Sequence, residues 1–171
     1  MKSSLRNYNV QFSGLKDGLH QVSFEIGAEF FENFEYSLIE SGEVLIDMEL
    51  DKKPNMLTTR YKVKGVVNTT CDRCADPLEL PVEGAFKLVF KFGKEQSDNE
   101  ELIVLPPEAY MLEMAPYFYE FINVLLPARK VHEEGECNEE MVTLISQYSI
   151  NSSDPDDEDD FEDDWDEDEE E

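Results

Sequence analysis

Hydrophobic and polar residues alternate through the middle of the chain with the two-residue period of a strand buried on one face. In segments 43–50 and 58–68, apolar side chains recur at alternate positions and are opposed by charged ones. Pro54 and Asn55 lie in a turn-like break between the two segments. The segments are therefore expected to pair as a hairpin, with acids of the first strand beside bases of the second.

A longer alternating segment follows at 78–92 and predicts a third strand. Its apolar face would carry Leu78, Leu80, Val82, Phe86, Leu88, Phe90 and Phe92. Shorter strands are predicted within 8–12, 22–26 and 102–105. Burial on one side only is typical of an antiparallel sheet that keeps one face in solvent.

Helical spacing appears mainly in the second half of the chain. Pro116 suits the first position of a helix, and Pro127 would end it. Between them, apolar residues recur at helical spacing: Tyr117, Phe118, Phe121, Ile122 and Leu125. A short helix is expected within 28–36, which contains three phenylalanines, and one more amphipathic turn within 141–148.

These elements predict one α+β domain over residues 1–146 and a tail over residues 147–171. The domain would be built on a curved, mainly antiparallel β-sheet that approaches a barrel, with one main helix covering it.

The charge is distributed very unevenly along the chain. The 171 residues include 14 Lys and Arg against 41 Asp and Glu, which gives a formal net charge of -27. Fifteen of the acids lie in 154–171, interrupted only by Pro155, Phe161 and Trp165. Such a segment cannot bury enough apolar surface to offset its ordering entropy, so the acidic tail is expected to be disordered.

Several classes of protein are disfavoured by the same residues. The N-terminus leads into no apolar segment typical of a secretory signal, and no stretch is apolar enough to span a bilayer. Three cysteines do not make a secreted disulfide framework. A cytoplasmic protein without a membrane partner is therefore expected.

No catalytic set of residues stands out. The chain contains no phosphate-cradling glycine loop and no nucleophile elbow, and its many carboxylates are dispersed. The sequence thus favours a binding protein without a small-molecule substrate over an enzyme.

Four residues have the types and spacing of a metal site. Cys71 and Cys74 lie in a tight connection between predicted strands, and His132 and Cys137 lie in a loop after the predicted helix. Three sulfurs and one imidazole are a ligand set of structural Zn²⁺. Reduced, partly buried thiols with a surface histidine would give the same sequence. Thiol redox chemistry is a third interpretation, although such pairs usually lie at a strand-to-helix junction.

A basic segment interrupts this acidic protein between positions 52 and 94, with nine bases and four acids. The residues predicted to contact RNA are Arg60, Lys62, Lys64, Arg73, Lys87 and Lys91. Bases aligned along the exposed face of a sheet could follow a phosphate backbone. Alternatively, they are solvated charges balanced by Glu43, Asp47 and Glu49. No aromatic ladder accompanies them, so base stacking is not indicated.

Two motifs carry a resemblance to a known family. The first is Cys71-Asp72-Arg73-Cys74 between two alternating segments, and the second is Leu125-Leu126-Pro127 followed by His132 and Cys137. In these motifs, and over most of residues 5–146, the chain resembles the YceD family of large ribosomal RNA subunit accumulation proteins. The resemblance marks Arg73 as well as the four candidate ligands. Many relatives end in a short apolar and basic segment, whereas this chain ends in acids.

The resemblance implies a cytosolic role in accumulation or processing of large-subunit ribosomal RNA, with no established catalytic activity. The leading hypothesis is a non-enzymatic ribosome-biogenesis factor that binds precursor RNA or assembly intermediates through the basic sheet face. The alternative is an acidic chaperone or adaptor for a basic ribosomal protein. The acidic tail would then attract that protein or compete with RNA, or serve only to keep the chain soluble.

Overall fold

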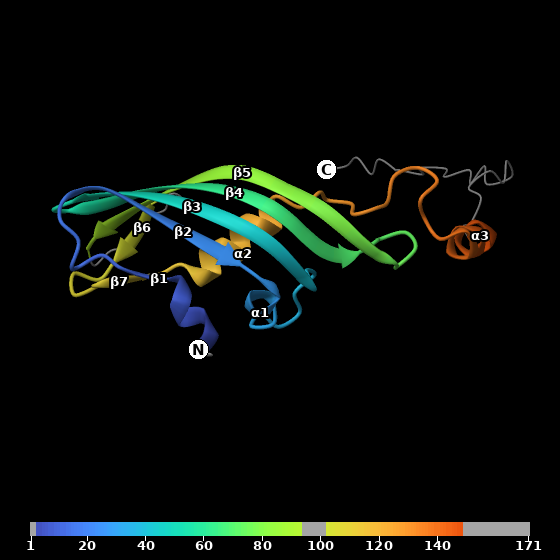
Figure 1. The fold of residues 1–171 in the computed structure, drawn as a ribbon, viewed down its shortest axis with the longest axis horizontal. Helices are drawn as coiled ribbons and strands as arrows, with labels where there is room; N and C mark the ends of the chain where they lie inside the picture. The colour runs from blue at the N-terminus through green and yellow to red at the C-terminus, as the bar shows by residue number, and fades with distance from the viewer. Residues whose placement is uncertain (1–2, 94–101, 149–171) are drawn as a thin grey trace, which may run out of the picture.

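The computed structural model describes residues 3–93 and 102–148 (Figure 1). Its main feature is a five-stranded sheet in the order β2-β3-β4-β5-β6. The strands are β2 (Gly18–Ile26), β3 (Ser41–Lys53), β4 (Met56–Thr70), β5 (Pro77–Phe92) and β6 (Leu102–Leu105). The first four strands pair antiparallel with their neighbours in the chain, which confirms the predicted hairpin and the mainly antiparallel sheet. β6 differs, because it pairs parallel to the end of β5.

The remaining elements are short. They are a 3₁₀ helix η1 (Ser3–Tyr8), β1 (Asn9–Gln11), α1 (Ala28–Phe31), β7 (Met111–Glu113), α2 (Ala115–Val124) and α3 (Glu139–Tyr148). β1 and β7 form a separate antiparallel pair. Among the described residues, no helix is both long and apolar enough to cross a membrane.

The sheet arches over α2 and stays open, so the predicted approach to a barrel is wrong (Figure 1). Its edge strands are β2 and β6, which do not pair with each other in the described part of the chain. β6 spans four residues and covers only Val89–Phe92 of β5. The concave face is instead closed by α2, whose apolar side takes the place that further strands would have in a barrel.

The core lies between the concave face of the sheet and α2. Phe118 of α2 is fully buried beside Tyr61 of β4, with ring centroids 6.0 Å apart. Phe121 stacks on Phe86 of β5, with centroids 4.3 Å apart and the planes 7° from parallel. Burying each such side chain contributes about 1.5–3 kcal/mol, so the alternating strands and the helical stripe stabilise each other.

Glycines permit two close approaches in this body. A Cβ at Gly84 would overlap a methyl group of Leu125, so the missing side chain lets the end of α2 approach β5. A Cβ at Gly65 would meet the backbone of Glu43 and Val44 on the neighbouring strand β3. The second approach is the less adaptable one, because a backbone cannot rotate away as a leucine methyl can.

The ends of some elements differ from the sequence predictions. α1 spans only four residues, and Phe34 lies beyond it, stacked on Tyr119 at a centroid distance of 4.0 Å. The expected amphipathic turn is a ten-residue helix, α3, that extends to Tyr148 and thus into the predicted tail. The disorder predicted for the rest of the tail concerns residues 149–171, which lie outside the described residues.

Candidate metal centre and charged sheet face

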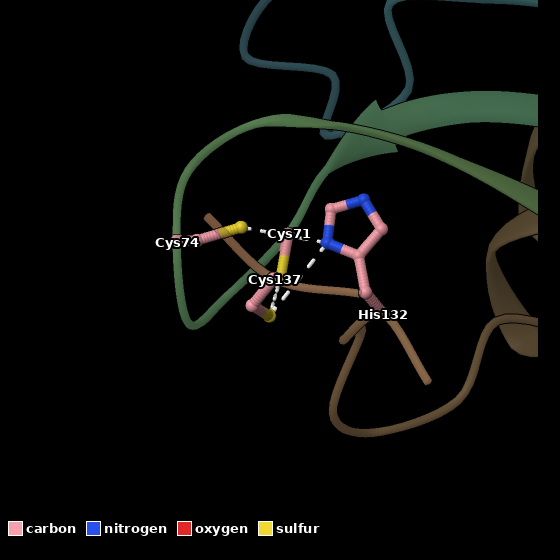
Figure 2. Close-up of side chains that lie close together, drawn as sticks. All are labelled: Cys71, Cys74, His132 and Cys137. Atoms are coloured by element: carbon pink, nitrogen blue, oxygen red, sulfur yellow. Dashed lines mark hydrogen bonds between the residues drawn. The ribbon is translucent and has the colours of Figure 1, made fainter. Parts of the chain in front are cut away.

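Two connections far apart in the chain bring Cys71, Cys74, His132 and Cys137 together (Figure 2). Cys71 and Cys74 lie in the tight loop between β4 and β5, whereas the other two lie in the segment that leads from α2 to α3. The four potential ligand atoms all lie within 4.8 Å of one another. All three cysteines are buried free thiols.

Three of the six distances between these atoms are close to the edges of a coordination tetrahedron. The sulfurs of Cys71 and Cys137 lie 3.8 Å apart. Nδ1 of His132 lies 3.4 Å from the sulfur of Cys74 and 3.8 Å from that of Cys137. A tetrahedron with Zn–S of about 2.3 Å and Zn–N of about 2.0–2.1 Å has edges of about 3.8 Å and 3.6 Å, respectively. The four residues therefore fit a Cys₃His zinc site.

The imidazole of His132 is already oriented for such a role. Its Nε2 lies 3.0 Å from the carbonyl oxygen of Pro77, the first residue of β5. A carbonyl oxygen only accepts, so Nε2 carries the hydrogen and Nδ1 presents a lone pair to the three sulfurs. A ring nitrogen bound to a backbone carbonyl is the usual support of a metal-binding histidine.

The loop between β4 and β5 is shaped by its own backbone. Cys71 N–H donates to the carbonyl of Asp76, and Ala75 N–H donates to the carbonyl of Cys71, each at a distance of 2.9 Å. Ala75 adopts a positive φ of 61°, which turns the chain back toward β5. The N–H of Arg73 points at the sulfur of Cys71 from 3.4 Å. The turn thus aims backbone donors at a sulfur, as in metal-binding knuckles.

This environment favours the thiolate forms of Cys71 and Cys74. Burial opposes its ionisation, but N–H groups of the loop, those of Cys74 and Arg73 first, outweigh burial and lower its pKa to about 6. The pKa of Cys74 is lowered in the same way, against burial, by the N–H groups of Asn138 and Asp76. Thiolates are the form in which cysteine binds metals.

Arg73 lies in this centre and not on the sheet face, where the sequence placed it with the other RNA-contact candidates. Its Nε donates to the sulfur of Cys137 at 3.0 Å, and its Nη2 donates to the carbonyl oxygen of His132 at 3.2 Å. One guanidinium thus joins both members of the second ligand pair. The sequence offered a signal for this position, because Arg73 stands between two candidate ligands whose thiolate charge needs a counterion.

The centre packs apart from the core beneath the sheet. Cys71, Cys74 and Cys137 form a small buried cluster with Leu78, against which Leu80 and Val131 pack. An ion pair closes its outer side, where Nζ of Lys130 lies 3.0 Å from a carboxylate oxygen of Asp72. The segment after α2 is therefore attached to the sheet mainly through this cluster.

The other five predicted RNA-contact residues do share one exposed face. Arg60, Lys62 and Lys64 alternate along β4, and Lys87 and Lys91 lie on the same face of β5. Arg60 is directly opposite Lys87 in the register. This face is the convex one, because the opposite side of both strands is buried against the core.

Acidic residues share the convex face with the bases, but most of them lie on other strands. On β4 and β5 this face carries the five bases and two acids, Glu79 and Glu83. On β2 and β3 the same face has one base, Lys53, and five acids: Glu25, Glu43, Asp47, Glu49 and Asp51. The convex face therefore has an acidic half on β2 and β3 and a basic half on β4 and β5.

One ion pair joins the two halves where they meet, and a second lies within the basic half. Arg60 contacts Glu49 at 2.9 Å, and Lys64 contacts Glu83 at 3.9 Å with both side chains strongly exposed. Such surface pairs contribute about 0–1 kcal/mol each. Within the described ranges, Lys62, Lys87 and Lys91 have no carboxylate within 4.0 Å.

Comparison with known proteins identifies a family whose model matches the chain. The model of the family described as "Large ribosomal RNA subunit accumulation protein YceD" matches residues 59–169. That match covers most of β4, both halves of the candidate metal centre and α2. No curated protein and no solved structure matches the chain significantly.

Proposed function

Because the chain belongs to the YceD family of large ribosomal RNA subunit accumulation proteins, we propose that it is a cytoplasmic, non-enzymatic factor of ribosome biogenesis. It supports accumulation of large-subunit ribosomal RNA by binding the precursor RNA or an assembly intermediate. The family description names an accumulation role and no reaction.

The basic half of the convex face is the RNA contact in this proposal. The observation that carries it is the alignment of Arg60, Lys62, Lys64, Lys87 and Lys91 on two adjacent strands. Lys62, Lys87 and Lys91 contribute most, since no ion pair in the described part of the chain engages them. Bases at such spacing bind phosphates without reading sequence, so an RNA partner would be selected by its shape.

Charge reversal tests the RNA contact. Lys62→Glu and Lys87→Glu should each weaken binding of the full chain to a large-subunit precursor RNA transcript about tenfold at moderate salt. Each should also reduce the slope of log affinity against log salt by about one ion. Lys16→Glu is the matched control, because Lys16 is exposed and lies outside the sheet before β2. Equal affinity of all three variants would remove the convex face from the mechanism.

A structural zinc ion is the second part of the proposal. Cys71, Cys74, His132 and Cys137 would hold it, and the metal would supply a fixed link between the β4–β5 loop and the segment after α2. Three of these four residues are buried, and His132 is half-buried. Cys₃His sites in which protein residues fill all four positions are structural and not catalytic.

A second function is favoured by one property of the chain. Beyond His132 there are 20 acidic and no basic residues. Such a segment suits a chaperone that holds a basic ribosomal protein. RNase treatment separates the two functions: partners bound through RNA are released, whereas a directly held protein stays with the chain.

A further inference from the structure

The helix α3 is the element of the fold that packs least. None of its ten residues is buried within the described structure. It lies beyond the end of the sheet, away from the concave face that α2 covers (Figure 1). Its sequence is nevertheless strongly amphipathic, since Met141, Leu144, Ile145 and Tyr148 recur at the i, i+3, i+4, i+7 spacing of a single stripe.

This stripe is strongly exposed to solvent, although its side chains are apolar or aromatic. Met141 and Leu144 are 36% and 46% exposed, and Tyr148 is 81% exposed. The opposite face of the helix carries polar residues, Thr143 and Gln147 among them. A ten-residue helix is marginal in water by itself, because helical stability in proteins comes mostly from packing of the apolar face.

The N-terminus of α3, which is the root of the helix, is fixed by hydrogen bonds, whereas its apolar face has no buried residue. Cys137 precedes Asn138, whose Oδ1 accepts from the N–H groups of Glu140 and Met141 at 3.1 and 3.4 Å. The side chain of Asn138 thus caps the helix N-terminus directly after a residue of the metal centre. The helix starts from a fixed point and presents its stripe to solvent.

The surrounding charge indicates what can cover the stripe. From 133 to 148 the chain has five acids and no base: Glu133, Glu134, Glu136, Glu139 and Glu140. A second copy of the chain would bring its own strong negative charge, -27 in total, to the same surface. RNA would bring phosphates. Both are repelled, whereas a protein with lysines and arginines around an apolar groove is attracted.

From these observations we infer that α3 is a docking helix, which inserts Met141, Leu144 and Tyr148 into an apolar groove bordered by bases on a basic protein. This is the helix-in-groove mode of recognition, in which residues of one helical stripe act as anchors. Given the proposed function, the class of partner is a basic ribosomal protein of the large subunit. The metal centre then serves as the fixed root that orients the docking helix.

Two pairs of substitutions on opposite faces of α3 test the inference in the full chain. Met141→Ala with Leu144→Ala removes the stripe, and Thr143→Ala with Gln147→Ala alters the polar face by the same number of alanines. Alanine favours helix, so both variants should keep α3, as circular dichroism can verify. Each protein is titrated with every large-subunit ribosomal protein, purified singly, at physiological salt.

At least one ribosomal protein should bind the unaltered chain, and the stripe variant should bind it at least tenfold more weakly. The polar-face variant should stay within twofold. Glu133→Gln with Glu134→Gln should slow association and weaken its salt dependence, because these acids steer the partner. Equal binding by stripe and polar-face variants, or no binding by any member of the complete set, overturns the inference.

Two further measurements separate this result from the other proposals. Sedimentation of the chain alone should give the same oligomeric state for the unaltered chain and the stripe variant; a dimer that is lost in the stripe variant means that a second copy covers α3, which overturns the inference. The stripe variant should bind the precursor RNA transcript as the unaltered chain does. Failure of the sheet-face variants to affect RNA would reject the RNA contact and leave the helix result standing.

Discussion

The guanidinium of Arg73 donates a hydrogen bond through Nε to the sulfur of Cys137 at 3.0 Å, although the two residues lie 64 positions apart. The same side chain also binds the carbonyl of His132. Three thiolates around Zn²⁺ leave one net negative charge, which a buried site must balance. Arg73 is therefore expected to balance this charge and to position Cys137, because it binds the sulfur directly.

Arg73→Ala should lower zinc affinity about 10–100-fold, the usual effect of removing a residue that supports a metal ligand. Competition with a chromophoric chelator measures this affinity. Arg73→Lys should restore only part of it, because an ammonium cannot reach the sulfur and the carbonyl as one planar fork does. Arg129→Ala is the control, since Arg129 is exposed and lies three positions before His132. Unchanged affinity in Arg73→Ala would leave Arg73 without a role at the metal.

Protein purified without chelator should contain about one zinc per chain, and Cys74→Ser should lose it. Removal of the metal should lower the melting temperature by about 10 °C, since a loss of several kcal/mol shifts a domain of this size by a few degrees per kcal/mol. Hydrogen exchange should rise first in 128–148, because that segment is attached mainly through the small cluster around the cysteines. A metal-free chain with unchanged melting and exchange would contradict the zinc site.

Gly65→Ala should destabilise the fold by about 1–3 kcal/mol, because its new Cβ would meet the backbone of β3 and not a movable side chain. Urea denaturation measures the change. Gly14→Ala serves as the control, since none of the described atoms lies within 4 Å of a Cβ there. Alanine is no worse than glycine in a strand, so a loss at Gly65 alone reports the close approach of the strands.

Phe121→Ala should cost about 3–5 kcal/mol of unfolding free energy, because it removes the ring stacked on Phe86 and leaves a cavity between α2 and the sheet. Val124→Ala, on the same helix but 66% exposed, should change stability by less than about 0.5 kcal/mol. Similar effects of the two substitutions in urea denaturation would mean that α2 does not close the core.

Much of the fold could be predicted because periodicity and burial coincide. The alternation in β3, β4 and β5 follows directly from a sheet with one buried face, and the register places Glu49 opposite Arg60 as the hairpin prediction required. The parallel pairing of β6 could not be predicted, since four consecutive apolar residues at 102–105 carry no periodic signal. Phe34 lies beyond the end of α1 and stacks on Tyr119, a tertiary contact that local spacing does not reveal.

The candidate site was predictable in its parts and not in its assembly. Each ligand pair has a recognisable spacing, but Cys74 and His132 lie 58 positions apart, and only the folded chain brings the pairs together. Arg73 was grouped with the sheet-face bases on charge alone, and its hydrogen bond to Cys137 depends on that same long-range meeting. The placing of acids on β3 beside bases on β4 followed from the predicted hairpin, whereas the ion pair between Arg60 and Glu49 depends on side-chain geometry.

The meeting of Cys74 with His132 also has a topological consequence. A metal bound at that point acts as a cross-link, closing a loop that contains β5, β6, β7 and α2. Cross-linking a loop of this length reduces the entropy of the denatured chain by the equivalent of about 4 kcal/mol in the chain-entropy model. A metal bound there would give the protein, without an oxidant, the kind of stabilisation that secreted proteins derive from disulfides.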